Sequence, residues 1–226
     1  CFKAGKLVFS GVMDPANFVH LHLHTSYSLL DSSIRHSALF KRAQEFGMPA
    51  VAMTDHGNMF GAVEFYNAAR KHGIKPIIGC EVYVAPESRH EKTSKDNLRD
   101  ASYHLILLSE NEKGYKNLLK LVTKGYLEGF YYKPRIDKEL LAEYSEGLIA
   151  LSSCVRGEVA HNVNRENVPR AIKIAAQYAE IMGEDNFFLE LQNHQLENQD
   201  RINKEIIGIG KKLGLPVVAT NNCHYI

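Results

Sequence analysis

The chain has 226 residues, of which 45% are hydrophobic and 23% are charged, the proportions of a soluble globular protein that can bury a core without disulfides. Its 27 basic and 26 acidic residues leave a net charge of +1, which excludes a strong overall field for nucleic acid, so any contact with DNA must be local. The four cysteines form no CxxC pair, which argues against zinc-finger and thioredoxin-type chemistry and, beside the histidines, indicates a reduced, cytoplasmic protein. No apolar run is long enough to span a membrane, so no membrane contact is expected.

Residues 1–16 are predicted to be an N-terminal extension or a cloning remnant, with Met13 as the candidate natural start. Residues 17–226 are predicted to form a single domain, because their number suits one α/β barrel.

Strand-like apolar runs alternate with helical patterns along the first half of this domain. Strands are expected at 19–25, 50–56 and 75–85, and helices at 33–46 and 60–72. Ser33 can cap the first helix, and Gly47 and Gly73 can end the two helices. Residues 86–101 are polar and charged, which predicts an exposed loop.

The second half repeats this alternation. Strands are expected at 103–109, 148–154, 187–194 and 216–225, and helices at 111–128, 168–182 and 197–213. Residues 129–136 are an irregular aromatic and basic stretch. Strands that alternate with helices predict a parallel α/β fold with helical crossovers, either an open doubly wound sheet or a closed barrel.

The first strand carries a histidine at every second position, namely His20, His22 and His24. Alternate residues of a strand share a face, so these imidazoles should point one way while Leu21 and Leu23 point the other. Three imidazoles on a buried face are costly unless they bind a metal or find hydrogen-bond partners. The alternative is a set of solvent-exposed histidines on an edge strand, which the apolar neighbours disfavour.

Most of the other predicted strands also carry residues that can bind a metal, and most of these stand at the strand end. Parallel α/β folds gather functional residues at the carboxyl ends of their strands. His104 stands near the start of its strand, which predicts a deeper position in the barrel. The candidates are Asp55, His56, Glu81, His104, Cys154, His194, Asn222 and His224.

A mixture of nitrogen and oxygen ligands suits borderline divalent ions such as Zn²⁺, Mn²⁺ or Fe²⁺. The candidates outnumber the ligands of one tetrahedral site, so two or three divalent ions are expected. Clustered divalent ions activate a bound water and stabilise both oxygens of a phosphoester displacement. The residues therefore predict a metallohydrolase that acts on phosphoesters.

Five short motifs resemble the PHP (polymerase and histidinol phosphatase) family, and they occur in the family's order. They are HLHT at 22–25, TDHG at 54–57, GCE at 79–81, YHL at 103–105 and NNCHY at 221–225. The resemblance implies an α/β fold, a distorted (β/α)7 barrel of PHP type that holds up to three metal ions. Longer segments are similar to the N-terminal PHP domains of bacterial DNA polymerase III alpha subunits, among them SLLD at 28–31, GFYYKPRID at 129–137, LIALSSCVRGEV at 148–159 and LELQNH at 189–194.

Carried over by position, the resemblance implies a set of metal ligands. Asn222 stands where the family usually has an aspartate, and its neutral amide is the weaker ligand. His20, Asp55 and His194 are expected just outside the ligands, where such residues orient them. The implied ligands are His22, His24, Asp31, His56, Glu81, His104, Cys154, Asn222 and His224.

The resemblance leaves three functions open. The first is a PHP domain of a replicative polymerase that acts as a metal-dependent 3′–5′ exonuclease in proofreading. The second is a non-catalytic, metal-stabilised docking module, and the third is a free-standing phosphatase of a small phosphate ester. The near-complete ligand set favours the first over the second, and GFYYKPRID disfavours the third. The implied partners are the remaining polymerase domains, a proofreading subunit, and DNA as substrate of the holoenzyme.

Lys133 and Arg135, with the tyrosines beside them, are candidates for holding phosphate while bases stack nearby. The alternative, which we favour, is that residues 129–136 form a packed connector whose tyrosines cover the barrel.

Overall fold

A computed structural model of the chain describes residues 18–92 and 102–226. The predicted extension at 1–16 and the second part of the predicted loop at 86–101 lie outside these residues. The helices are α1 (His36–Glu45), α2 (Ala62–Lys71), α3 (Glu112–Leu127), α4 (Lys138–Glu143), α5 (Glu158–Asn164), α6 (Val168–Met182) and α7 (Gln199–Leu213). The strands are β1 (Ala50–Met53), β2 (Lys75–Val84), β3 (Tyr103–Ser109), β4 (Arg135–Ile136), β5 (Leu148–Leu151), β6 (Phe187–Leu191) and β7 (Val217–Ala219).

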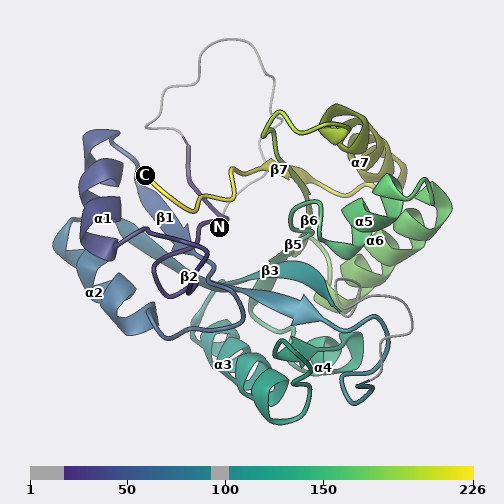
Figure 1. Ribbon diagram of the computed structural model, residues 1–226, viewed down its shortest axis with the longest axis horizontal. Coiled ribbons are helices and arrows are strands. Elements are labelled where there is room, and N and C mark those ends of the chain that lie inside the picture. Colours follow the sequence, from purple (N-terminus) through teal and green to yellow (C-terminus); the bar gives the residue numbers. More distant parts are fainter. Residues whose placement is uncertain (1–17, 93–101) are drawn as a thin grey trace.

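The strands form one curved sheet with the order β1-β2-β3-β5-β6-β7, and the short β4 pairs with β2. Figure 1 shows the helices around the outside of this sheet. The pairs β1–β2, β2–β4, β5–β6 and β6–β7 are parallel. The chain thus forms the distorted α/β barrel that the sequence predicted.

One strand departs from the predicted parallel arrangement, because β3 runs antiparallel to both β2 and β5. The described residues between β2 and β3 contain no helix, and an antiparallel pair needs no helical crossover. In the β2–β3 register, Glu81 lies opposite Ile106 and Tyr83 lies opposite His104. The start of β3 therefore lies at the same edge of the sheet as the carboxyl end of β2.

The predicted first strand at 19–25 is an irregular extended segment that makes two isolated bridges, His20 with Val51 and Leu23 with Cys223. On one side the carbonyl groups of His20 and Leu23 accept hydrogen bonds from the residues of β1 and the turn after it. On the other side the backbone N–H of His24 donates to the carbonyl of Cys223, whose own N–H donates to the carbonyl of His22. The segment thus joins β1 to the chain after β7 and closes the barrel.

The backbone bends at His22, so the predicted alternation of this segment is wrong at two positions. Leu21 packs against Ala52, Ile106 and the other apolar residues of a small inner cluster, while Leu23 belongs to the large core beneath the helices. His20 lies near Leu23, and its Nδ1 is 3.4 Å from Sγ of Cys223. His20 therefore does not share a face with His22 and His24.

Two short helices, α4 and α5, were not predicted, and α1 begins at His36, so Ser33 is not its cap. The side chain of Asp137 caps α4 by accepting a hydrogen bond from the backbone N–H of Leu140. None of the described helices is long and apolar enough to cross a membrane.

The start of α3 lies against the turn before β5, where a Cβ on Gly114 would be 1.8 Å from the carbonyl oxygen of Gly147. We expect Gly114→Ala to push the helix and the turn apart and to lower the free energy of unfolding by about 1–3 kcal/mol, measured by urea denaturation. The matched control is Gly208→Ala in α7, whose Cβ would meet nothing within 4 Å. That change should raise stability by about 0.5–1 kcal/mol, and equal effects of the two variants would contradict the packing described for Gly114.

Candidate metal centre

Six of the predicted ligands meet at one end of the barrel. They form three overlapping groups in which the possible ligand atoms all lie within 4.8 Å of one another. The groups are His22, His24 and Glu81; His56, Glu81 and His104; and His24, His56 and His224.

Glu81 lies at the centre of this cluster. It stands in the second part of β2, where all residues are buried. Its Oε2 is 2.7 Å from Nε2 of His22 and 3.6 Å from Nε2 of His24. Its Oε1 is 3.0 Å from Nδ1 of His56 and contacts Nδ1 of His104. The reversed direction of β3 delivers His104 to this rim, so its predicted deeper position is wrong.

Several of these atoms are close together without forming hydrogen bonds. Nε2 of His24, Nδ1 of His56, Nδ1 of His104 and Oε1 of Glu81 are all buried and have no hydrogen-bond partner. Buried polar atoms rarely stay unpaired, whereas lone pairs that converge on a shared point are what a metal ion requires. The imidazole and carboxylate donors therefore fit divalent ions such as Zn²⁺, Mn²⁺ or Fe²⁺.

The cluster holds its histidines in different charge states. Burial lowers the pKa of His24 to about 4, so this ring is neutral and keeps a lone pair. For His22, burial opposes the charged form, but the carboxylates of Glu190 and Glu81 outweigh it and raise the pKa to about 10. Burial also opposes ionisation of Glu81, yet His104, His22 and His24 hold the pKa of this carboxyl well below its usual range.

Asp31, Asn222 and His224 form the outer rim of the cluster. Oδ2 of Asp31 is 2.5 Å from Nε2 of His56 and 3.6 Å from Nδ1 of His224. Oδ1 of Asn222 is 3.0 Å from Nε2 of His224. The prediction of a strand through 222–225 is wrong, because β7 ends at Ala219 and Asn222 has a left-handed φ of 45°. The Asn222 side chain nevertheless reaches His224.

Asp55 supports the cluster from behind. Its fully buried carboxylate accepts hydrogen bonds from the backbone N–H of Thr25 at 2.6 Å, from Oγ1 of Thr25 at 2.7 Å and from Oγ of Ser28 at 2.7 Å. The same Ser28 hydroxyl lies 3.1 Å from Nδ1 of His24. Asp55 therefore acts on an imidazole through a serine hydroxyl.

Glu190, which the sequence analysis missed, lies beside His22, with Oε1 2.7 Å from Nδ1. The one signal in the sequence is an acidic residue inside the apolar run FFLEL of β6.

Besides Asp31, Asp55 and Asn222, three other predicted residues lie outside the ligand groups. Cys154 shares a small cavity with Glu190 and Gln192, and burial raises the pKa of its thiol to about 12. His194 is exposed, and its backbone N–H donates to Gln199. His20 contacts Cys223 on the helix side of the sheet. The assignment of Cys154 as a ligand stays a prediction.

Lys133 and Arg135 differ in their surroundings. Arg135 is buried and donates hydrogen bonds to the carbonyl groups of Gly129 and Glu91, so it holds the connector together and cannot reach DNA, which corrects that candidate. Lys133 is exposed, and its Nζ lies 5.3 Å from the ring centroid of Tyr83. The Tyr83 ring contacts those of His56 and His104, which places Lys133 at the rim of the cluster.

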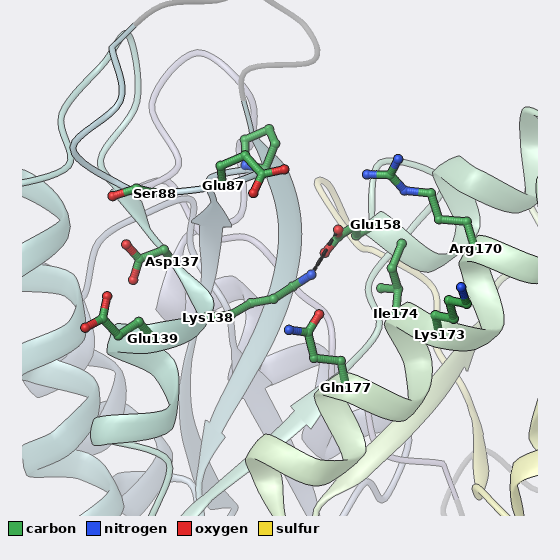
Figure 2. Close-up of a pocket in the computed structure, with 11 residues that line it drawn as sticks. Glu87, Ser88, Asp137, Lys138, Glu139, Glu158, Arg170, Lys173, Ile174 and Gln177 are labelled. Atoms are coloured by element: carbon green, nitrogen blue, oxygen red, sulfur yellow. Dashed lines mark hydrogen bonds and ion pairs between the residues drawn. The ribbon is translucent and has the colours of Figure 1, made fainter.

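A separate cavity of about 650 Å³ lies between α4 and α6, and Figure 2 shows its charged lining. Nζ of Lys138 is 2.8 Å from Oε2 of Glu158, which also accepts a hydrogen bond from the Tyr178 hydroxyl at 2.9 Å. Lys138 and Glu158 are thus paired with each other, and none of the clustered ligands lines this cavity.

The fold and the cluster together define a class of protein. The family model described as PHP domain matches residues 20–194, so the chain belongs to the PHP domain family. Among solved structures, an amidohydrolase from Chromobacterium violaceum has a TM-score of 0.56 at 13% identity, covering 92% of this chain and 87% of that chain. A Bacteroides vulgatus protein described as containing a predicted PHP-like metal-dependent phosphoesterase has a TM-score of 0.55 at 15% identity, covering 92% of this chain and 52% of that chain. At these identities the likeness shows the fold alone.

Within this class, the chain is similar to one particular protein of many bacteria. It is 46% identical to DNA polymerase III subunit alpha of Treponema pallidum over 209 aligned residues, and this alignment covers 92% of the chain. It is 47% identical over 214 residues to DNA polymerase III subunit alpha of Aquifex aeolicus, which covers 93% of this chain. The chain spans 18% of the length of each of these relatives.

His22 and His56 are both predicted ligands, but they differ in burial. Their substitution should therefore lower stability by different amounts. His22 is fully buried between the carboxylates of Glu81 and Glu190, while 19% of the His56 side chain is exposed. In protein freed of metal by a chelator, we expect His22→Ala to cost about 3–5 kcal/mol in urea denaturation, because it leaves two buried carboxylates without their partner. His56→Ala should cost less, and both variants should bind less metal. Equal losses of stability would contradict this account of His22.

Proposed function

We propose that this chain is the PHP module of a bacterial replicative DNA polymerase alpha subunit, and that its cluster is a metal-dependent phosphoesterase centre that removes nucleotides from a DNA 3′ end. The single observation that carries the proposal is the Glu81 carboxylate among four imidazoles, with buried lone pairs that converge without hydrogen bonds. The relatives named as alpha subunits support the polymerase context, in which the remaining alpha domains and a proofreading subunit are the expected partners.

Two or three divalent ions are the proposed cofactors. Glu81 is the proposed shared ligand, because its Oε2 faces His22 and His24 while its Oε1 faces His56 and His104. His22 and His24 complete one group, His56 and His104 another, and His224 with Asp31 lies on the solvent side. Such ions supply an activated water and charge stabilisation for phosphoester cleavage.

Residues of the chain itself would position the substrate. Lys133 is the exposed cation beside Tyr83, so it is the candidate contact for a DNA phosphate at the rim. Because the net charge is only +1, this contact and the bound ions would provide the local attraction for DNA. The cytoplasm is the expected location of such a protein.

A second candidate is a metal-stabilised docking module without catalysis. The observation that favours it is Asn222, whose neutral amide lies 3.0 Å from His224 where the family usually has a carboxylate. Weak binding of one ion would leave a structural cluster with little activity.

Metal content and hydrolysis distinguish these functions. We expect the chain, purified without chelator, to carry two or three Zn²⁺, Mn²⁺ or Fe²⁺ ions in elemental analysis, because the three ligand groups are formed. Reloaded protein should shorten 3′-labelled single-stranded DNA, chelator-treated protein should not, and a small phosphomonoester should be a poorer substrate. A metal-loaded chain that cleaves neither substrate would support the docking module, and a chain without stoichiometric metal would refute both.

The Asn222 position gives a more specific expectation. Asn222→Asp is nearly isosteric and places a negative charge beside His224 and Asp31. We expect affinity for one ion to rise by about tenfold, equivalent to about 1.4 kcal/mol, and any hydrolysis rate to rise with it. The control is Asn67→Asp at an exposed position of α2, outside the cluster, where metal titrations should match the parent. Superimposable titrations of the Asn222 variant and the parent would show that the cluster does not use this charge.

A further inference from the structure

Glu190 is a buried carboxylate beneath the cluster that the functions considered so far do not use. Its Oε1 is 2.7 Å from Nδ1 of His22 and accepts hydrogen bonds from Nε2 of Gln192 at 2.7 Å and from the Thr220 hydroxyl. The backbone N–H of Glu190 donates to Oγ of Ser152 at 2.8 Å. The residues that directly follow β5, β6 and β7 thus hold the backbone and the carboxylate of Glu190 in place.

This contact determines which nitrogen of His22 is free. A carboxylate only accepts hydrogen bonds, and a neutral imidazole has one N–H donor and one lone pair. The network therefore holds a proton on Nδ1. In the metal-free chain Nε2 also carries a proton, because it lies 2.7 Å from Oε2 of Glu81, so a metal ion bound with His24 and Glu81 would replace the Nε2 proton and leave the one on Nδ1 in place. The opposite tautomer would point the proton at the metal position.

The second oxygen of Glu190 shows that the carboxylate has no partner beyond this network. Oε2 is buried without a hydrogen-bond partner, beside a cavity of about 10 Å³ that Ser153, Cys154 and Gln192 also line. A buried negative charge of this kind is costly unless a cation compensates it. Protonated His22 is that cation in the metal-free chain, and a metal ion held by His22 would take over this role.

We propose that Glu190 is a positioning residue that fixes the Nδ1–H tautomer of His22 and strengthens its Nε2 as a metal ligand. Carboxylates that hydrogen-bond a ligating histidine typically increase metal affinity by about 10–100-fold. The inference rests on the proposed metal-binding function. If the parent chain binds metal and substitution of Glu190 does not change the metal affinity, this inference fails while the proposed metal-binding function stands.

The test compares Glu190→Gln with a matched buried carboxylate elsewhere. Glu158 is also buried and hydrogen-bonded, but it pairs with Lys138 and Tyr178 at the other cavity (Figure 2). Zn²⁺ is titrated into the metal-free 226-residue chain against a chromophoric chelator, and histidine tautomers are read from ¹⁵N NMR of the zinc-loaded protein. We expect Glu190→Gln to lower the affinity for one zinc ion by about 10–100-fold and to give His22 a mixture of tautomers. Glu158→Gln should bind zinc with the affinity of the parent.

Each outcome decides the proposal. Parent-like zinc affinity with an unchanged His22 tautomer would overturn it, because Glu190 would then be structural only. Loss of one ion even at saturating zinc would also overturn it, because Glu190 would then be a ligand itself. If Glu190→Gln does not fold, Thr220→Val removes one hydrogen bond to the same oxygen. That variant should lower the affinity for the same ion by a smaller factor than the one expected for Glu190→Gln. Binding as tight as in the parent would count against the proposal.

Discussion

The structure depends on the burial of one carboxylate, Glu81, among four imidazoles from three separate segments of the chain. Taking such a charge out of water costs several kcal/mol unless partners compensate it. His22 compensates it with a proton, because its pKa is raised to about 10 despite burial. A divalent ion would replace that proton, so metal binding and proton release are coupled at this residue. The barrel must therefore close around Glu81 with its histidines in place.

The direction of β3 is what makes this closure possible. His104 stands second in its strand, and in a parallel strand it would lie at the edge of the sheet away from the cluster. Because β3 runs antiparallel to β2 and β5, its first residues lie beside the last residues of β2, and His104 contacts Glu81. The irregular segment at 18–25 has a similar role, since its bend lets both Leu21 and His22 face the interior.

Much of this arrangement could be predicted from sequence, because it depends on local patterns. Asn167 caps α6, which runs from Val168 to Met182 as its apolar spacing predicted. The residues of the three ligand groups were all among the candidates, because imidazoles and carboxylates are conspicuous in apolar runs. Strand direction and the bend at His22 could not be predicted, since both depend on contacts between segments far apart in the chain. Glu190 was missed for the same reason, as its partners are His22 and Thr220.

The chemistry of the proposed ligands also determines how a nearly neutral chain would attract the proposed DNA substrate. Most of the clustered ligands are imidazoles. The carboxylates among them are Glu81 and Asp31, and those of Glu190 and Asp55 lie directly behind. Imidazoles bind metal as neutral groups, so two divalent ions would balance these carboxylates and a third would give the site a net positive charge. An aspartate at position 222 would bind metal more tightly but would reduce that charge. In the proposed metal-loaded site, the neutral amide of Asn222 would bind metal less tightly but would leave a stronger positive field at the rim where Lys133 lies. This field would exist only with the ions bound, so metal loading would be the step that prepares the proposed site for a phosphate group.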